Sequence, residues 1–152
     1  MSKVKIYSKS ILIPVGIGLI IGAITSSSIE YNTLIKPVFA PLSILFPIVW
    51  TILYVLMGVS YGILESKSLV NLEINFIYYF QLLVNALWSI IFFTFKWRLF
   101  AFIWLLILLL LIVMMIIKFY QRDKVAGLLQ IPYLLWALFA SYLNFAIYLL
   151  NR

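Results

Sequence analysis

The residues with the most chemical potential in this chain are neutral aromatic and amide side chains that recur at helical spacing. Such spacing places them on one face of a helix. Flat rings can stack on a flat ligand, and amides can exchange hydrogen bonds with it without carrying charge. If the stripes share one cavity, it suits a large, flat, mainly apolar molecule. The three predicted stripes are Phe46, Trp50, Tyr54, Met57 and Tyr61; Gln81, Asn85, Trp88 and Phe92; and Tyr133, Trp136, Ala140 and Asn144.

An alternative is that the stripes only join helices. Asn and Gln commonly bond between membrane helices, and Trp and Tyr form belts at membrane interfaces. For any single residue this interpretation is at least as good as ligand binding. Trp50 and Trp88 favour a cavity for the set, because each lies near the middle of a predicted span, too deep for a belt.

Residues for acid–base, metal or covalent chemistry are scarce. The sequence has no His and no Cys, which excludes disulfides, Cys–His nucleophile pairs, His-ligated haem, and imidazole or thiolate metal sites. Proton-coupled transport and buried hydrolysis usually need ionisable groups inside the membrane. We therefore expect neither class, and we expect no cofactor and no metal. The only acids lie at or near predicted connectors: Glu30, Glu65, Glu73 and Asp123.

The elements that must position the stripes are membrane-spanning helices. Of the 152 residues, 66% are hydrophobic and only 10% are charged, against about 25% charged in soluble domains. A span needs about 20 apolar residues, and in lipid its backbone must be hydrogen-bonded internally. The first apolar run, near 11–29, is longer than the apolar core of a signal peptide and lacks a clear cleavage site. We therefore expect it to stay in the protein as the first span. The sequence thus predicts one all-α membrane domain over 1–152, a five-helix bundle with spans near 11–29, 42–64, 72–95, 99–119 and 125–150.

The charge pattern predicts membrane orientation. The net charge is +7, but the basic residues lie mostly between apolar runs and at the amino end, which favours anionic lipid headgroups over nucleic acid. The excess of Lys and Arg on one side predicts a cytoplasmic amino end. The lack of a transit-type presequence indicates a bacterial inner membrane.

Prolines and glycines mark the spans. Pro47 and Pro132 lie near the starts of two spans, so each either bends its helix or occupies the first turn. Gly18 and Gly22 form a G-x-x-x-G pair that would allow close approach of another helix, from this chain or from another subunit.

Three motifs in order, "KPVFAP…VWTILYVLMG", "QLLVNALWSIIFF" and "PYLLWALFASYLN", resemble the translocator protein family, also called TspO or tryptophan-rich sensory proteins. The resemblance implies a five-helix bundle, usually a homodimer, that binds porphyrins such as protoporphyrin IX beneath the loop joining the first two spans. Stripes and resemblance together predict nine ligand-binding residues: Phe46, Trp50, Tyr54, Gln81, Asn85, Trp88, Trp136, Ala140 and Asn144. The loop motif predicts a lid of Lys36, Pro37, Phe39 and Pro41.

The chain departs from the family pattern in several places. Phe39 stands where relatives often carry a loop tryptophan, and Trp104 stands where many carry an acid in the fourth span. A sterol-type pattern of Leu143, Tyr148 and Arg152 is weak, because Phe145 occupies the usual tyrosine position.

Three functions stay open at this point. The first is tetrapyrrole binding for sensing or transport. The second is light-dependent porphyrin breakdown, for which the resemblance implicates the paired tryptophans Trp50 and Trp136. The third is a scaffolding membrane protein without a ligand.

Overall fold

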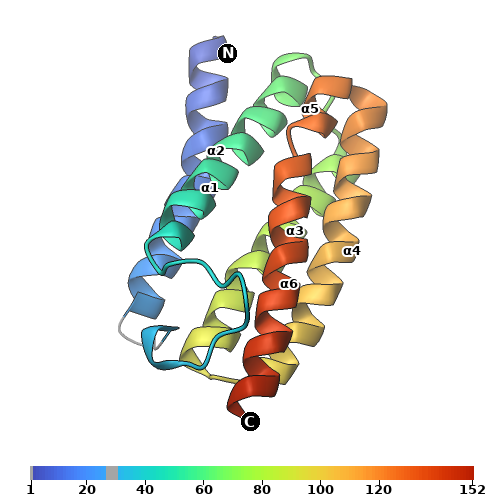
Figure 1. The fold of residues 1–152 in the computed structure, drawn as a ribbon. Coiled ribbons are helices and arrows are strands. Elements are labelled where there is room, and N and C mark those ends of the chain that lie inside the picture. The colour runs from blue at the N-terminus through green and yellow to red at the C-terminus, as the bar shows by residue number, and fades with distance from the viewer. Residues whose placement is uncertain (1, 27–30) are drawn as a thin grey trace.

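Long helices dominate the chain (Figure 1). The computed structural model describes residues 2–26 and 31–152. Five helical segments are long and apolar enough to cross a membrane, and the described residues contain no strand, so the predicted all-α, five-span architecture is confirmed. The elements are α1 (Lys3–Thr25), η2 (Tyr31–Thr33), α2 (Leu45–Ser66), α3 (Leu72–Ser89) with its π-helical continuation η3 (Ile90–Thr94), α4 (Arg98–Arg122), α5 (Lys124–Leu128) and α6 (Ile131–Asn151).

Helix α1 extends beyond the apolar run that the sequence predicts as a span. It begins at Lys3, because Ser2 caps it: Ser2 Oγ accepts a hydrogen bond from the Lys5 backbone N–H at 3.3 Å. The end of that predicted run, from residue 27 onward, lies outside the described residues. Helix α1 is also the most peripheral span, with 17% of its most apolar window buried inside the protein against 56% for α3 and η3.

Two prolines occupy first helical turns, where a missing backbone N–H costs little. Pro47 lies in the first turn of α2, and Pro132 in the first turn of α6. The predicted fifth span is thereby divided into α5 and α6, with Leu129 and Gln130 between them. Pro14 lies inside α1 instead, so the carbonyl of Ser10 has no N–H one turn later to accept from.

Helix α1 approaches α2 closely at two glycines of α2. A Cβ on Gly58 would lie 2.5 Å from the Ser10 carbonyl oxygen, and one on Gly62 would lie 2.7 Å from the Tyr7 ring. The predicted G-x-x-x-G pair acts differently. A Cβ on Gly18 would meet the Tyr54 ring at 2.5 Å, whereas one on Gly22 would find no atom within 4 Å. Neither glycine of the pair packs against a helix backbone.

The core of the bundle runs along α4. One stripe of this helix is fully buried at intervals of three and four residues, the spacing of a helix that packs on one face. It lies against α3 and α6, while other leucines and isoleucines of α4, such as Ile107 and Leu110, are exposed and suited to lipid. The buried stripe consists of Ala101, Leu105, Leu108, Ile112, Met115 and Phe119.

Ion pairs join the helices at the end where α1 begins. Three acids each pair with a lysine from another element, so the negative charges of this end are compensated within the described residues. The pairs are Lys9–Glu65 at 3.5 Å, Lys67–Asp123 at 2.5 Å, and Lys118–Glu73.

Candidate ligand-binding site

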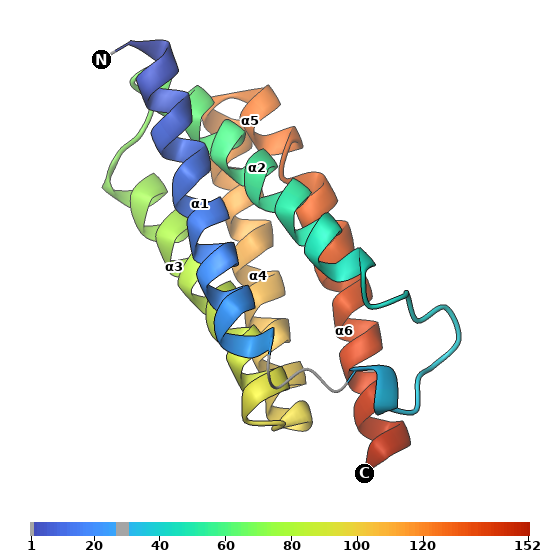
Figure 2. The ribbon, with the colours of Figure 1, turned by 90° about the vertical axis from the view of Figure 1, so that its left-hand side faces the viewer.

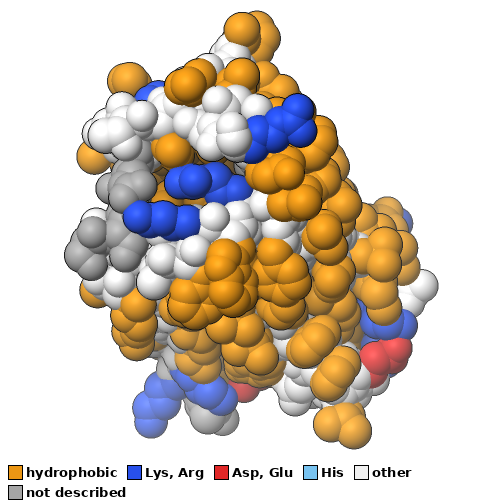
Figure 3. All heavy atoms as spheres, turned by 90° about the horizontal axis from the view of Figure 1, so that it is seen from below, with side chains coloured by type: hydrophobic (Ala, Val, Ile, Leu, Met, Phe, Trp, Pro, Cys, Tyr) orange, Lys and Arg blue, Asp and Glu red, His pale blue; other side chains and the backbone are white. Residues whose placement is uncertain are grey.

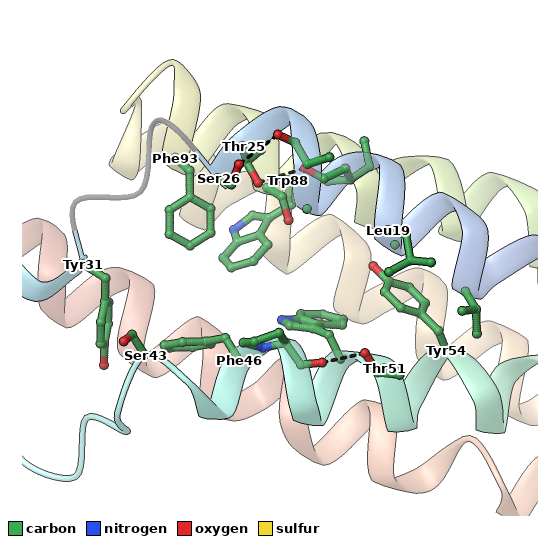
Figure 4. A pocket seen from close by; sticks show the side chains of 18 residues that line it. Leu19, Thr25, Ser26, Tyr31, Ser43, Phe46, Thr51, Tyr54, Trp88 and Phe93 are labelled. Carbon is green, nitrogen blue, oxygen red and sulfur yellow. Dashed lines mark hydrogen bonds between the residues drawn. The ribbon is translucent and has the colours of Figure 1, made fainter.

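A cavity of about 460 Å³ lies where α1 and α2 separate (Figure 4). The two helices touch at Gly58 and diverge toward the carboxyl end of α1, as Figure 2 shows. The α1 side of the cavity is small and aliphatic, with Val15, Gly18, Leu19 and Gly22 among its lining residues. The opposite sides, from α2, α3, η3 and the loop before α2, are lined by rings: Tyr31, Phe46, Trp50, Tyr54, Trp88 and Phe93.

A second hollow of about 20 Å³ lies on the α6 side of the same aromatic wall. It shares Phe46, Trp50 and Trp88 with the larger cavity, and α6 contributes Trp136, Ala140 and Asn144. The Phe46 and Trp136 rings lie with centroids 6.1 Å apart, edge to face. Seven of the nine predicted ligand-binding residues therefore line one of two hollows that share a wall.

Trp50 is the centre of this wall. Its ring stacks on Tyr54 with centroids 5.7 Å apart and an interplanar angle of 28°. It lies 6.3 Å from the Trp88 ring, and Trp88 in turn stacks on Phe92 at 5.5 Å. Offset arrangements of this kind are the favoured geometry for aromatic pairs, and they hold each ring at a fixed angle to the cavity.

The other two predicted residues, Gln81 and Asn85, lie behind Tyr54 and line neither hollow. The Tyr54 hydroxyl donates to Asn85 Oδ1 at 2.7 Å, and Asn85 Nδ2 donates to the Tyr133 hydroxyl at 2.8 Å. That hydroxyl donates to Gln81 Oε1 at 2.8 Å. Both polar atoms of Asn85 are thus used within the protein, and the network joins α2, α3 and α6.

Asn144 also has both of its polar atoms bonded. It accepts from Trp88 Nε1 at 3.0 Å and donates through Nδ2 to the Arg98 carbonyl at 2.8 Å. It therefore connects α6 to α3 and to the start of α4. The indole Nε1 of Trp136 differs, since it is buried without a hydrogen-bond partner in the described part of the chain. A polar ligand atom or a water could pair with it.

The predicted lid residues do not line the cavity; the loop meets it through Tyr31 and Ser43. Lys36 Nζ donates to the Tyr31 carbonyl at 3.0 Å, and the Tyr31 hydroxyl donates to the Pro41 carbonyl at 2.6 Å. Phe39 points outward with 86% of its surface exposed.

The loop is tied to α6 by hydrogen bonds. The Tyr142 hydroxyl donates to the Val38 carbonyl at 2.9 Å. Asn151 bonds both backbone groups of Ile35, at 3.0 Å to its N–H and at 2.8 Å to its carbonyl. The loop is thus held against the carboxyl half of α6, with Tyr31 placed against the cavity.

Trp104 fills a structural position. Its indole Nε1 donates to the Val84 carbonyl at 2.8 Å, which joins α4 to α3. A neutral donor thus occupies the position at which the family resemblance implies an acid in many relatives. Among the described residues, no group of three or more His, Cys, Asp or Glu side chains could hold a metal ion.

Sequence reasoning missed the α1 side of the cavity, together with Tyr31, Ser43 and Phe93. The spacing of Gly18 and Gly22 carried a signal for α1, because small residues on one face leave room beside a helix. The G-x-x-x-G pattern predicts a helix contact in that room, but at Gly22 the room opens into the cavity.

Five apolar helices around an internal aromatic hollow define the class: an integral membrane protein with a preformed pocket among its helices. A sequence model described as the TspO/MBR family matches residues 10–150, and the chain belongs to this family. It is 39% identical over 145 residues to "Tryptophan-rich protein TspO" of Archaeoglobus fulgidus, covering 93% of this chain and 94% of that protein.

Two further relatives cover most of the chain. "Tryptophan-rich protein TspO" of Chlorobaculum tepidum is 36% identical over 124 residues, which is 80% of this chain and 78% of the relative. "Protein CrtK" of Rhodobacter capsulatus is 34% identical over 134 residues, which is 86% of this chain and 83% of the relative.

Proposed function

We propose that this protein binds a flat, mainly apolar tetrapyrrole of the protoporphyrin IX type in the cavity between α1, α2 and α3, and acts in sensing or transport of porphyrins. The observation that carries the proposal is the single wall of Trp50, Tyr54 and Trp88 along a cavity of about 460 Å³. Ligand pockets commonly measure about 300–1,000 Å³ and combine apolar walls with few polar groups.

The composition of the cavity supports a large ring system over a small polar ligand. Its rings come from α2, α3, η3 and the loop, whereas the α1 side presents glycines and aliphatic residues, with the hydroxyls of Thr25 and Ser26 bonded to carbonyls of α1 itself. A flat molecule can lie between these sides with one face on the rings. The amides that would otherwise select a polar ligand, Asn85 and Asn144, are already hydrogen-bonded within the protein.

Titration of the purified protein with protoporphyrin IX in the dark tests the proposal. Saturable binding that Trp50→Ala weakens, with the fold intact, would support it. Absence of saturable binding would contradict it and would favour a scaffolding role without a ligand.

Light-dependent porphyrin breakdown is the second candidate. The favouring observation is that Trp50 lines both hollows and Trp136 lines the smaller one, so two indoles stand beside the same aromatic wall. An indole in contact with an excited porphyrin could act as an electron donor. Illumination of the complex decides between the two functions: loss of the Soret band that requires either tryptophan supports breakdown, and a stable band supports binding alone.

For the membrane setting, we propose an amino end in the cytoplasm, a bacterial inner membrane and a homodimer. The end where α1 begins carries more basic residues than the other, as the positive-inside rule requires of a cytoplasmic face. Reporter fusions at both ends test the orientation, and cross-linking in native membranes tests the dimer. A cytoplasm-active reporter working at the carboxyl end would contradict the orientation.

A further inference from the structure

The two ends of the bundle differ in how their charges are compensated. At the end where α1 begins, the three acids Glu65, Glu73 and Asp123 each pair with a lysine. At the opposite end, the described residues include cations but no acid, and Figure 3 shows basic side chains gathered there among apolar ones. Two of these cations, Lys36 and Arg98, are only half-exposed and form no ion pair with the described residues.

Lys36 lies over a ring of the cavity wall. Its ammonium nitrogen is 4.9 Å from the centroid of the Tyr31 ring, and Tyr31 lines both hollows. The ammonium also donates to the carbonyls of Tyr31 at 3.0 Å and Leu34 at 3.3 Å. An ammonium has three N–H donors, so one remains available to a ligand.

Arg98 likewise lies near a ring, one that lines the smaller hollow. Its guanidinium carbon lies 5.8 Å from the centroid of the Phe92 ring, which lines the smaller hollow. Its carbonyl is held by Asn144, another residue of that hollow. Its Nε is buried without a hydrogen-bond partner in the part of the chain that the structure describes.

A half-buried cation without a counter-charge is unfavourable, and a ring face compensates it only in part. Two such cations behind Tyr31 and Phe92 would be compensated by an anion at this end of the hollows. The body of the ligand would remain against the apolar rings. The ligand chemistry that satisfies both demands is a flat apolar body with acidic groups at one edge.

We propose that Lys36 and Arg98 form a carboxylate-binding subsite beside the loop end of the two hollows, next to the rings of Tyr31 and Phe92, so that the protein selects tetrapyrroles that carry free carboxylates on one edge. This inference rests on the proposed function, because it assumes that the ring system occupies the aromatic cavity. A charge-assisted hydrogen bond from either cation to a carboxylate is stronger than a neutral one.

The test compares protoporphyrin IX with its dimethyl ester, which keeps the ring and removes both charges. Dark titrations are run on the full-length protein in one detergent. The variants are Lys36→Gln, Arg98→Gln and the double variant. Arg152→Gln is the matched control, because Arg152 is an exposed cation at the same end. The measured quantity is the ratio of diacid affinity to ester affinity in each protein, which cancels differences in partitioning and in fold.

We expect this ratio to fall by about tenfold for each cation removed, the size of one lost charge-assisted hydrogen bond, and to stay unchanged in Arg152→Gln. An equal ratio in the wild type and the double variant, with saturable binding of both porphyrins, would overturn the subsite and leave the proposed function standing. Failure of the wild type to bind either porphyrin would overturn both.

Discussion

The hydroxyl of Tyr54 donates to Asn85 Oδ1 at 2.7 Å, and this contact separates the aromatic cavity from a buried polar network. The Tyr54 ring faces the cavity, while its oxygen joins α2 to the amides of α3 and to Tyr133 of α6. One side chain therefore serves both as pocket wall and as a link between three helices.

We expect Asn85→Leu to lower stability more than it lowers ligand affinity. The substitution leaves two buried hydroxyl groups, of Tyr54 and Tyr133, without their amide partner, at a cost of about 1–3 kcal/mol. Thermal unfolding and porphyrin titration on the same sample check this. Tyr133→Phe is the control, because it removes the two hydrogen bonds of the Tyr133 hydroxyl, and Tyr133 lines neither hollow. An affinity loss with unchanged thermal stability would show instead that Asn85 contacts the ligand.

We expect Trp50→Ala to weaken porphyrin binding more than Trp136→Ala. Trp50 lines both hollows, whereas Trp136 lines only the one of about 20 Å³. Loss of the stacked ring removes about 0.5–1.5 kcal/mol beyond the lost contact area. Trp50→Phe should be milder, since a ring remains. Dark absorbance titrations measure all three variants, and a larger effect at Trp136 would place the ligand nearer α6.

Gly58→Ala should destabilise the packing of α1 on α2. The added methyl group would lie 2.5 Å from backbone atoms of Ser10 and Ile11, which cannot rotate away. Overpacking of this kind costs about 1–3 kcal/mol. Gly16→Ala is the matched control, because a Cβ there has no atom within 4 Å. Thermal unfolding in detergent should separate the two variants, and equal stabilities would show that α1 shifts freely on α2.

Acid should weaken the connection between Lys67 and Asp123. The Lys67 ammonium, with help from the Ala126 backbone N–H, holds the pKa of the Asp123 carboxyl below its usual range. A carboxyl whose pKa is lower in the folded state than in the unfolded state stabilises the fold. This stabilisation is complete above the unfolded-state pKa of about 3.9, and it is lost as pH falls through the folded-state pKa. The effect should be small, because the Lys67 side chain is 58% exposed.

Asp123→Asn tests the pH dependence, because Asn can still cap α5 while the charge is gone. Thermal stability of the wild type should fall more steeply than that of the variant below about pH 4. Parallel curves for the two proteins would show that this carboxyl is not coupled to folding.

Much of the fold could be predicted because lipid imposes it. Runs of apolar residues predict the membrane spans. The positions of Trp50, Trp88 and Trp136 predict which faces of α2, α3 and α6 point into the bundle. The beginning of α1 could not be predicted from hydropathy, because Ser2 caps a helix whose first two turns carry Lys3, Lys5 and Lys9.

The hydrogen-bond partners within the site were also beyond sequence reasoning. The pattern placed Gln81 and Asn85 on one face, but only the packing of α6 against α3 brings the Tyr133 hydroxyl between them. The outward position of Phe39 depends on the bonds from Tyr142 and Asn151 to the loop, which join residues more than a hundred positions apart.

The contact of Gly58 with the backbone of α1 makes the cavity mechanically linked to the far end of the bundle. Because the two helices touch there and diverge toward the cavity, the width of the cavity and the crossing angle of α1 and α2 change together. A ligand too thick for the resting cavity must rotate α1 about this contact. The amino half of α1 is itself held to α2 by the Gly62–Tyr7 contact and the Lys9–Glu65 ion pair, so contacts at the opposite end of the bundle resist widening of the cavity.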